Sequence, residues 1–280
     1  MCRWLAYTGS PILLEELLYK PKNSLVVQSL HSQLGAEATN GDGFGVGWYG
    51  ARSTPGVFRG TEPAWNDLNL RDLAAHISSP RVLAHIRASS GSPVQQTNCH
   101  PFRHGSWLWM HNGSIADFLA VKRDLSLAVD PALFPQIAGS TDSELLFYLA
   151  LTFGLEKDPH AGVERAVGFV EATGRRHGVE HPVQMTVVTT DGDAMWAFRY
   201  SSVGESRSLF HSTDVSTLRH QYPENPVLHE VSDDARLVVS EPLGDLRGAW
   251  REVPEATCVT IHGGTEELAA FTPSLPESAG

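Results

Sequence analysis

The sequence predicts an α+β fold in which helices pack on the outside of β-sheets. Three observations support this class: strand-like runs at the start of the chain, helical periodicity in its middle, and a return to strand patterns after residue 180. A length of 280 residues with 41% hydrophobic residues is enough for a large buried core. We therefore predict one domain over residues 2–272 and a loose tail at 273–280.

The first part of the chain is expected to form short strands joined by turns. Strands are predicted at residues 2–7, 46–49, 82–88 and 107–111, with a short helix at 13–19. The run Asn40-Gly41-Asp42-Gly43-Phe44-Gly45 precedes the second strand. Because glycine accepts backbone conformations closed to other residues, this run is expected to bring main chain close to residue 2.

The middle of the chain is expected to be helical. Apolar spacing predicts helices at 115–127, after Thr141, and at 161–175, where Gly178 lies just beyond the end. Thr141 and Glu144 have the spacing of a capping box. A hairpin then follows at 183–200, turning at Asp191-Gly192, and strands are expected near 208–211, 237–240, 257–261 and 268–271.

Charge, cysteine usage and hydropathy exclude several classes of protein. The net charge is −11, from 21 basic and 32 acidic residues, so no basic excess exists to bind nucleic acid. The longest apolar runs are too short to span a membrane. The three cysteines are far apart, which argues against a disulfide framework and favours a reducing cytoplasm.

Cys2 is the most informative single residue. Removal of the initiator methionine would leave Cys2 as the first residue, with a free α-amine beside its thiol. An α-amine titrates near pH ~8, so it can act as a base at neutral pH. A thiol beside such a base is an activated nucleophile. An incidental cysteine near the start of a chain is common, so Cys2 alone leaves both interpretations open.

Four polar clusters follow Cys2 in order. They are Asn40 to Gly45, His85 to Gly91, Asn98 to Phe102 with His111-Asn112-Gly113, and Gly139 to Glu144. This ordered set after an N-terminal cysteine resembles the class II glutamine amidotransferases, which are N-terminal nucleophile hydrolases. The resemblance covers roughly residues 2 to 150 by motif. It implies a four-layer αββα sandwich and chemistry on the side-chain amide of a glutamyl group.

The resemblance also implies a role for each matching residue. Cys2 would attack the amide to form a γ-glutamyl thioester, with its own α-amine as the base. The side-chain amide of Asn112 and the backbone N–H of Gly113 would form the oxyanion hole. Arg87 would bind the α-carboxylate of the glutamyl group, and Asp142 its α-ammonium.

Two further substrate-binding residues are expected from the motifs. Ser89 or Ser90 would offer a hydroxyl to the α-carboxylate, although members of the family often carry threonine just after the arginine, and this leaves the contact open. His100 matches a motif that shapes the pocket wall, and a structural role is favoured because the mechanism needs no imidazole base. From the residues alone, Asn112-Gly113 could instead be a hairpin turn and Asp142 a helix cap.

The length leaves no room for an appended synthase domain. The opening Met1 to Leu5 and the run at 98–102 resemble a stand-alone subgroup with YafJ-like proteins, the γ-glutamyl hydrolase of ergothioneine biosynthesis and a subunit of a glutathione-degrading complex. The implied substrate is a small γ-glutamyl amide, either glutamine or a γ-glutamyl thiol compound. Water would accept the glutamyl group, or ammonia would pass to a separate synthase or hydrolase subunit.

No cofactor or metal is expected, because the 13 histidines form no metal-binding helix pattern. Two other functions remain open. An acylase of the bile-salt or penicillin type also begins with cysteine, but the charged pair Arg87 and Asp142 does not suit an apolar acyl group. A non-catalytic subunit that binds glutamyl metabolites would need neither the Cys2 nucleophile nor the Asn112 donor.

Overall fold

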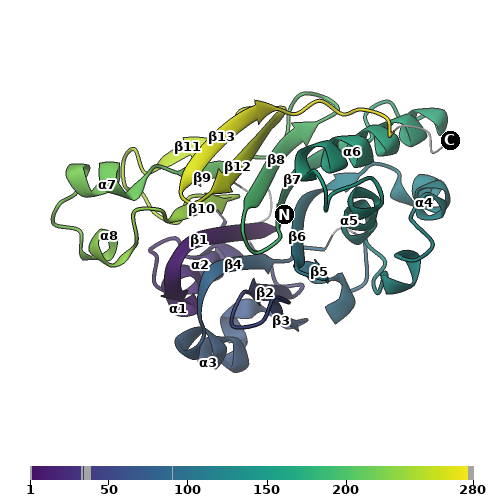
Figure 1. Ribbon diagram of the computed structural model, residues 1–280. Coiled ribbons are helices and arrows are strands. Elements are labelled where there is room, and N and C mark those ends of the chain that lie inside the picture. Colours follow the sequence, from purple (N-terminus) through teal and green to yellow (C-terminus); the bar gives the residue numbers. More distant parts are fainter. Residues whose placement is uncertain (1, 33, 35–38, 90, 277–280) are drawn as a thin grey trace.

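The structure, a computed structural model, describes residues 2–32, 34, 39–89 and 91–276. Two antiparallel sheets lie face to face at its centre (Figure 1). The first sheet has the strand order β11-β9-β10-β1-β4-β2-β3, and the second β13-β12-β8-β7-β6-β5. Helices cover the outer face of each sheet, which confirms the predicted four-layer αββα arrangement.

The strands have the following bounds. The first sheet contains β1 (Arg3–Leu13), β2 (Phe44–Trp48), β3 (Gly56–Gly60), β4 (Ser78–Ile86), β9 (Phe210–Ser212), β10 (Arg236–Val239) and β11 (Trp250–Glu252). The second contains β5 (Phe102–His104), β6 (Trp107–Ile115), β7 (Val183–Thr190), β8 (Met195–Ser201), β12 (Thr257–His262) and β13 (Thr265–Ala270).

The helices fall into two outer layers and one peripheral pair. Against the first sheet lie α1 (Leu14–Leu18), α2 (Leu25–Leu30) and α3 (Leu68–His76). Against the second lie α4 (Phe118–Leu127), α5 (Asp142–Thr152) and α6 (Pro159–Arg176). The pair α7 (Val215–Gln221) and α8 (Pro226–Glu230) sits at the far end of the first sheet (Figure 1). Short 3₁₀ turns occur at Ala64–Asn66, Gln96–Asn98 and Phe134–Gln136.

Both faces of β1 are buried, which explains its nearly continuous apolar sequence. Trp4 and Ala6 point into the layer between the sheets, whereas Leu5 and Tyr7 point toward the helices α1 to α3. Successive side chains of a strand point to opposite faces, so one strand contributes to two cores. The start of the chain is thereby fixed in the middle of the sheet, between β4 and β10 (Figure 1).

The element boundaries differ from the predictions in identifiable ways. The predicted helix at 115–127 begins only at Phe118, because Ile115 still pairs with Val183 in the sheet. The predicted strand at 2–7 continues to Leu13. The hairpin of β7 and β8 is confirmed, with Gly192 at a φ of 98° in the turn.

The end of the chain packs on helix α6. The backbone N–H of Ser274 donates to the carbonyl of Glu164 at 3.2 Å, and residues 277–280 of the predicted tail lie outside the described residues. Within the described part, no helix combines the length and the apolar composition that crossing a membrane requires.

Candidate active site

Cys2 lies at the start of β1, partly buried between the two sheets. Its Sγ accepts from the backbone N–H of Ala88 and lies equally close, at 3.3 Å, to the carbonyl oxygen of Ala88. The side-chain Nδ2 of Asn112 donates to the carbonyl oxygen of Cys2 at 2.8 Å. The predicted nucleophile and the predicted oxyanion donor are therefore in direct contact, although they are separated by more than a hundred residues of sequence.

A buried ion pair fixes Arg3, the residue that follows the predicted nucleophile Cys2. Arg3 Nε lies 3.0 Å from Glu241 Oε2, and both side chains are almost fully buried. Asn23 donates to the other carboxylate oxygen of Glu241, and Arg3 Nη1 donates to the carbonyl of Cys2. A buried pair needs such additional hydrogen bonds to offset the loss of hydration. The sequence analysis did not find this anchor, because its members lie at opposite ends of the chain.

The surroundings of Cys2 favour the neutral thiol over the thiolate. Burial raises its pKa, and the opposing effects of the Ala88 N–H and of the positive charges of Arg207 and Arg87 are smaller. A thiolate is the reactive form of cysteine. Because the pKa of the thiol is raised, a nucleophilic Cys2 needs a neighbouring base to take its proton.

Asn112 and Gly113 lie inside β6, where they pair with Thr186 and Met185 of β7. The alternative interpretation as a hairpin turn is therefore wrong. A Cβ at residue 113 would lie 1.9 Å from the carbonyl oxygen of Gln184. Only glycine fits this position. The backbone of β6 at Gly113 therefore packs closely against that of β7.

Arg87 follows β4 and is 3% exposed. Its guanidinium donates to neutral oxygens, among them the hydroxyls of Ser92 at 2.7 Å and Ser89 at 3.1 Å and the carbonyl of Asp42 at 3.3 Å. Within the described residues no carboxylate forms an ion pair with it. A buried guanidinium that is oriented but not neutralised is suited to binding a carboxylate from outside.

The glycine-rich run, which was expected to bring main chain close to residue 2, is hydrogen-bonded to the backbone of Arg87. The backbone of Asp42 and Gly43 pairs with that of Arg87, and the carboxylate of Asp42 accepts from the N–H of Ser89 at 2.7 Å. Asp42 was not predicted as a functional residue, and its place within the glycine-rich run was the available signal. Ser90 lies outside the described residues, so its predicted contact stays a prediction.

Asp142 is the first residue of helix α5. One carboxylate oxygen accepts from the N–H of Ile115 and the other from the N–H of Ser143, both at 2.8 Å. Thr141 caps the helix by accepting from Glu144 N, as predicted, but the Glu144 carboxylate accepts from Ala138 and Gly139 instead of completing the box. Asp142 is thus fixed beside the strand of Asn112 and Gly113.

Asn98 connects the segments that carry Arg87 and Asp142, the two residues predicted to bind the amino-acid part of the substrate, called the amino-acid clamp below. Its Nδ2 donates to the carbonyl of Pro93, in the loop that holds Arg87, at 3.0 Å. Its Oδ1 accepts from the N–H of Ser140 at 2.8 Å, two residues before Asp142. The sequence analysis listed Asn98 only as the first residue of the polar cluster that contains His100, and these hydrogen bonds could not be read from the sequence.

The rings of His100 and His85 contact each other in a tilted arrangement, with centroids 4.2 Å apart, and His85 lies against the Asn112 side chain. Burial lowers the pKa of His85 to about 3 and lowers those of His100 and His111 as well. All three rings are therefore neutral at pH 7. Within the described residues no group of three or more metal-ligating side chains is found.

These neutral histidines predict an acid-sensitive fold. A histidine with an unfolded pKa near 6.5 and a lowered folded pKa binds its proton more readily in the unfolded chain, so stability falls as the pH drops below about 6.5. For His85 alone we expect a loss of about 2 kcal/mol between pH 7 and 5. Urea denaturation at both pH values measures this loss.

His85→Gln should reduce that pH dependence, because a neutral amide has no proton to gain. His181→Gln is the matched control, since His181 is exposed. An equal pH dependence in the wild-type chain and in His85→Gln would show that His85 is not the group responsible.

Comparison with known proteins agrees with this geometry. The sequence profile of the class-II glutamine amidotransferases matches residues 20–278. The probable glutamine amidotransferase DUG3 of Saccharomyces cerevisiae is 35% identical over 292 residues, covering 93% of this chain and 82% of that protein. The gamma-glutamyl-hercynylcysteine sulfoxide hydrolase of Mycolicibacterium smegmatis is 25% identical over 252 residues, covering 86% of this chain and 99% of that protein.

Two solved structures share the fold. A glutamine aminotransferase class-II domain protein from Silicibacter pomeroyi superposes with a TM-score of 0.73 at 33% identity, covering 98% of this chain and all of its own. The glutamine phosphoribosylpyrophosphate amidotransferase of B. subtilis superposes with a TM-score of 0.63 at 15% identity, and the match covers 50% of that longer chain. The profile match, the full-length relatives and the shared αββα sandwich together show that this chain belongs to the class II glutamine amidotransferase family.

Proposed function

We propose that this chain hydrolyses the amide bond of small γ-glutamyl compounds, with Cys2 as the nucleophile. The observation that carries the proposal is the contact of Cys2 with Asn112, 2.8 Å from side-chain nitrogen to carbonyl oxygen, beside the unneutralised guanidinium of Arg87. Removal of the initiator methionine is part of the proposal, because it supplies the α-amine that the protonated thiol requires.

In the first half of the proposed reaction, the α-amine of Cys2 takes the thiol proton while sulfur attacks the γ-carbonyl carbon. The resulting oxyanion accepts from the Asn112 amide and the Gly113 N–H. An amide NH₂ has two donor hydrogens. The hydrogen bond from Asn112 to the Cys2 carbonyl uses one of them and leaves the other for the oxyanion.

Collapse of the tetrahedral intermediate breaks the carbon–nitrogen bond. The leaving amine takes its proton from the α-ammonium of Cys2, and a γ-glutamyl thioester remains. Water then attacks this thioester with the α-amine again acting as base, which releases glutamate and restores the thiol. Arg87 and Asp142 hold the α-carboxylate and α-ammonium of the glutamyl group throughout both steps.

The substrate class follows from this clamp and from the relatives. One relative is a gamma-glutamyl-hercynylcysteine sulfoxide hydrolase, which favours a γ-glutamyl thiol compound as the substrate. The family as a whole favours glutamine. Water accepts the glutamyl group, and the released amine diffuses into the solvent or passes to a separate synthase or hydrolase subunit. We place the reaction in the cytoplasm, because Cys2, Cys99 and Cys258 are all free thiols.

A hydrolysis screen tests the proposal. The chain that starts at Cys2 is incubated with glutamine, with glutathione and with an α-glutamyl amide, and released glutamate is measured. We expect release from at least one γ-glutamyl compound and none from the α-glutamyl amide, because the clamp requires free α-groups. The rate should rise from pH 6 to pH 8 as the α-amine loses its proton.

The control is a chain that carries an uncleaved tag ahead of Cys2. It keeps the fold but replaces the α-amine by an amide, which cannot act as a base. Glutamate release by the tagged chain at the full rate would refute the role of the amine. Absence of release from every γ-glutamyl compound would favour the non-catalytic binding function instead.

A further inference from the structure

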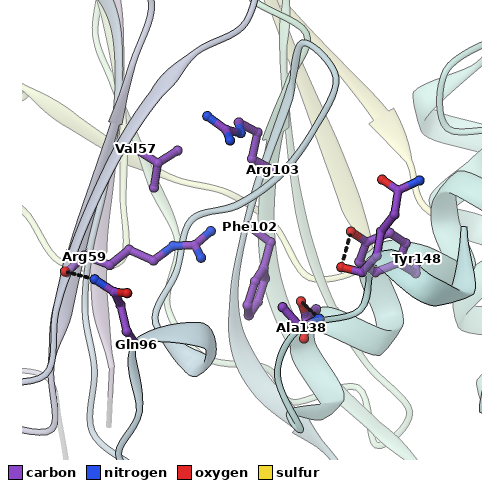
Figure 2. A pocket seen from close by; sticks show the side chains of 9 residues that line it. Val57, Arg59, Gln96, Phe102, Arg103, Ala138 and Tyr148 are labelled. Carbon is purple, nitrogen blue, oxygen red and sulfur yellow. Dashed lines mark hydrogen bonds between the residues drawn. The ribbon is translucent and has the colours of Figure 1, made fainter.

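A pocket of about 290 Å³ lies between β3 and β5, the edge strands of the two sheets. Figure 2 shows Arg59 extending into it from β3 and Arg103 from β5, with Tyr148 of α5 on the opposite side. Phe102 and Val57 are the apolar side chains nearest to these arginines in its lining. None of its lining residues belongs to the proposed catalytic cluster.

A series of ring contacts runs from Asn112 to this pocket. His85 lies against Asn112, the rings of His85 and His100 are 4.2 Å apart and tilted, and the rings of His100 and Phe102 are 4.5 Å apart. The Arg59 guanidinium lies over the last ring of this series, 5.8 Å from the Phe102 ring centroid. The pocket is therefore distinct from the candidate active site around Cys2, to which these rings connect it.

The two arginines bring two positive charges to a pocket whose described lining contains one carboxylate, that of Glu144. Arg59 donates through Nε, at 3.1 Å, and through Nη2 to the carbonyl of Pro101, and Arg103 Nη1 donates to the carbonyl of Pro55 at 3.0 Å. Both acceptors are neutral. Within the described part of the chain neither guanidinium has an ion pair, and burial lowers the pKa of Arg59.

Glu144 also lines the pocket, but its carboxylate is already engaged. Its two oxygens accept from the backbone N–H groups of Ala138 and Gly139, at 3.0 and 2.6 Å. The negative charge of Glu144 acts on Arg59, so two cations share one carboxylate and the pocket keeps an excess of positive charge. Arg59 is half-buried, and a charge that is partly removed from water favours a further counter-charge.

We propose that this pocket binds a small organic carboxylate, whose oxygens pair with Arg59 and Arg103. The planar guanidinium matches a carboxylate through two parallel hydrogen bonds. The Phe102 and Val57 side chains offer an apolar surface for the carbon body of such a ligand. At ~30 Å³ per water-sized group, the volume admits a ligand of roughly ten non-hydrogen atoms. The site goes beyond the proposed hydrolysis and does not depend on it.

Titration calorimetry with malonate tests the proposal, with inorganic phosphate as a second probe. We expect saturable binding of malonate that weakens about tenfold or more in Arg103→Gln and in Arg59→Gln, the usual effect of losing one charge-assisted hydrogen-bonded pair. Arg103 is exposed, so Arg103→Gln keeps the fold even if Arg59→Gln does not. Arg52→Gln, on an exposed neighbouring loop, is the charge-matched control and should bind as the wild type does.

Three results would overturn the proposal. Malonate giving no saturable heat at millimolar concentration would exclude a carboxylate site. Binding lost in Arg87→Gln but kept in Arg103→Gln would place the anion in the amino-acid clamp. Tight phosphate binding without malonate binding would contradict the organic carboxylate.

Discussion

Replacing Cys2 with alanine should lower γ-glutamyl hydrolysis by at least about 10⁴-fold, because it removes the group that attacks the carbonyl. Alanine is also small enough at this position to allow removal of the initiator methionine, so the α-amine is kept. Arg87 and Asp142 are untouched, and we expect binding of the glutamyl group to persist. Steady-state kinetics measure the first effect, and calorimetry with the intact substrate measures the second.

Cys99→Ala is the matched control for this substitution. Cys99 is completely buried, and burial raises the pKa of its thiol, so it is a poor nucleophile. Its loss should leave kcat within a few-fold of the wild type. The electrophilic analogue 6-diazo-5-oxo-norleucine should accordingly label Cys2 and not Cys99. Peptide mapping that finds the label on Cys99 would contradict the assignment of the nucleophile.

Arg87→Gln should raise KM by about 30- to 1,000-fold, which corresponds to ~2–4 kcal/mol for a buried charge-assisted contact. In the proposed function, the guanidinium contacts the α-carboxylate equally in the ground state and in the transition state. Its removal therefore weakens binding much more than it lowers kcat. Initial-rate measurements over a wide range of substrate concentration separate the two constants.

Arg81→Gln provides the comparison for Arg87→Gln. Arg81 lies on β4, the strand that Arg87 follows, but its guanidinium donates to the carbonyl of Asp193. KM should not change in this variant. If KM changes equally in both variants, the effect is a general loss of structure, and Arg87 does not bind the substrate.

The fold was predictable wherever one residue pattern dominated a segment. The alternation in β7 and β8 and the apolar face of α6 gave clear predictions that the structure confirms. Helix α3 was missed because only Leu70 and Ala74 of its residues are buried, so its periodicity is weak. Strand β3 was missed because glycine occupies both of its ends, and glycine has low strand propensity.

The sequence named the candidate site residues, but it did not give their connections. Arg87, Asn112 and Asp142 each stand in a short polar cluster, and Cys2 was noted for its position next to the initiator methionine. The supporting contacts join segments that no local pattern relates: Asn98 bridges Pro93 and Ser140. Register between strands decides which residues meet, and a single sequence contains little information about it.

The bond between Arg3 and Glu241 joins residues 238 positions apart. A ribosome adds roughly 5–20 residues per second, so Arg3 waits on the order of 10–50 s for its partner to be synthesised. During this interval the leading end of the chain is accessible to the peptidase that trims methionine. The proposed removal of methionine therefore has time to take place before the start of the chain is enclosed, and a nascent chain interrupted before Glu241 lacks the partner of Arg3.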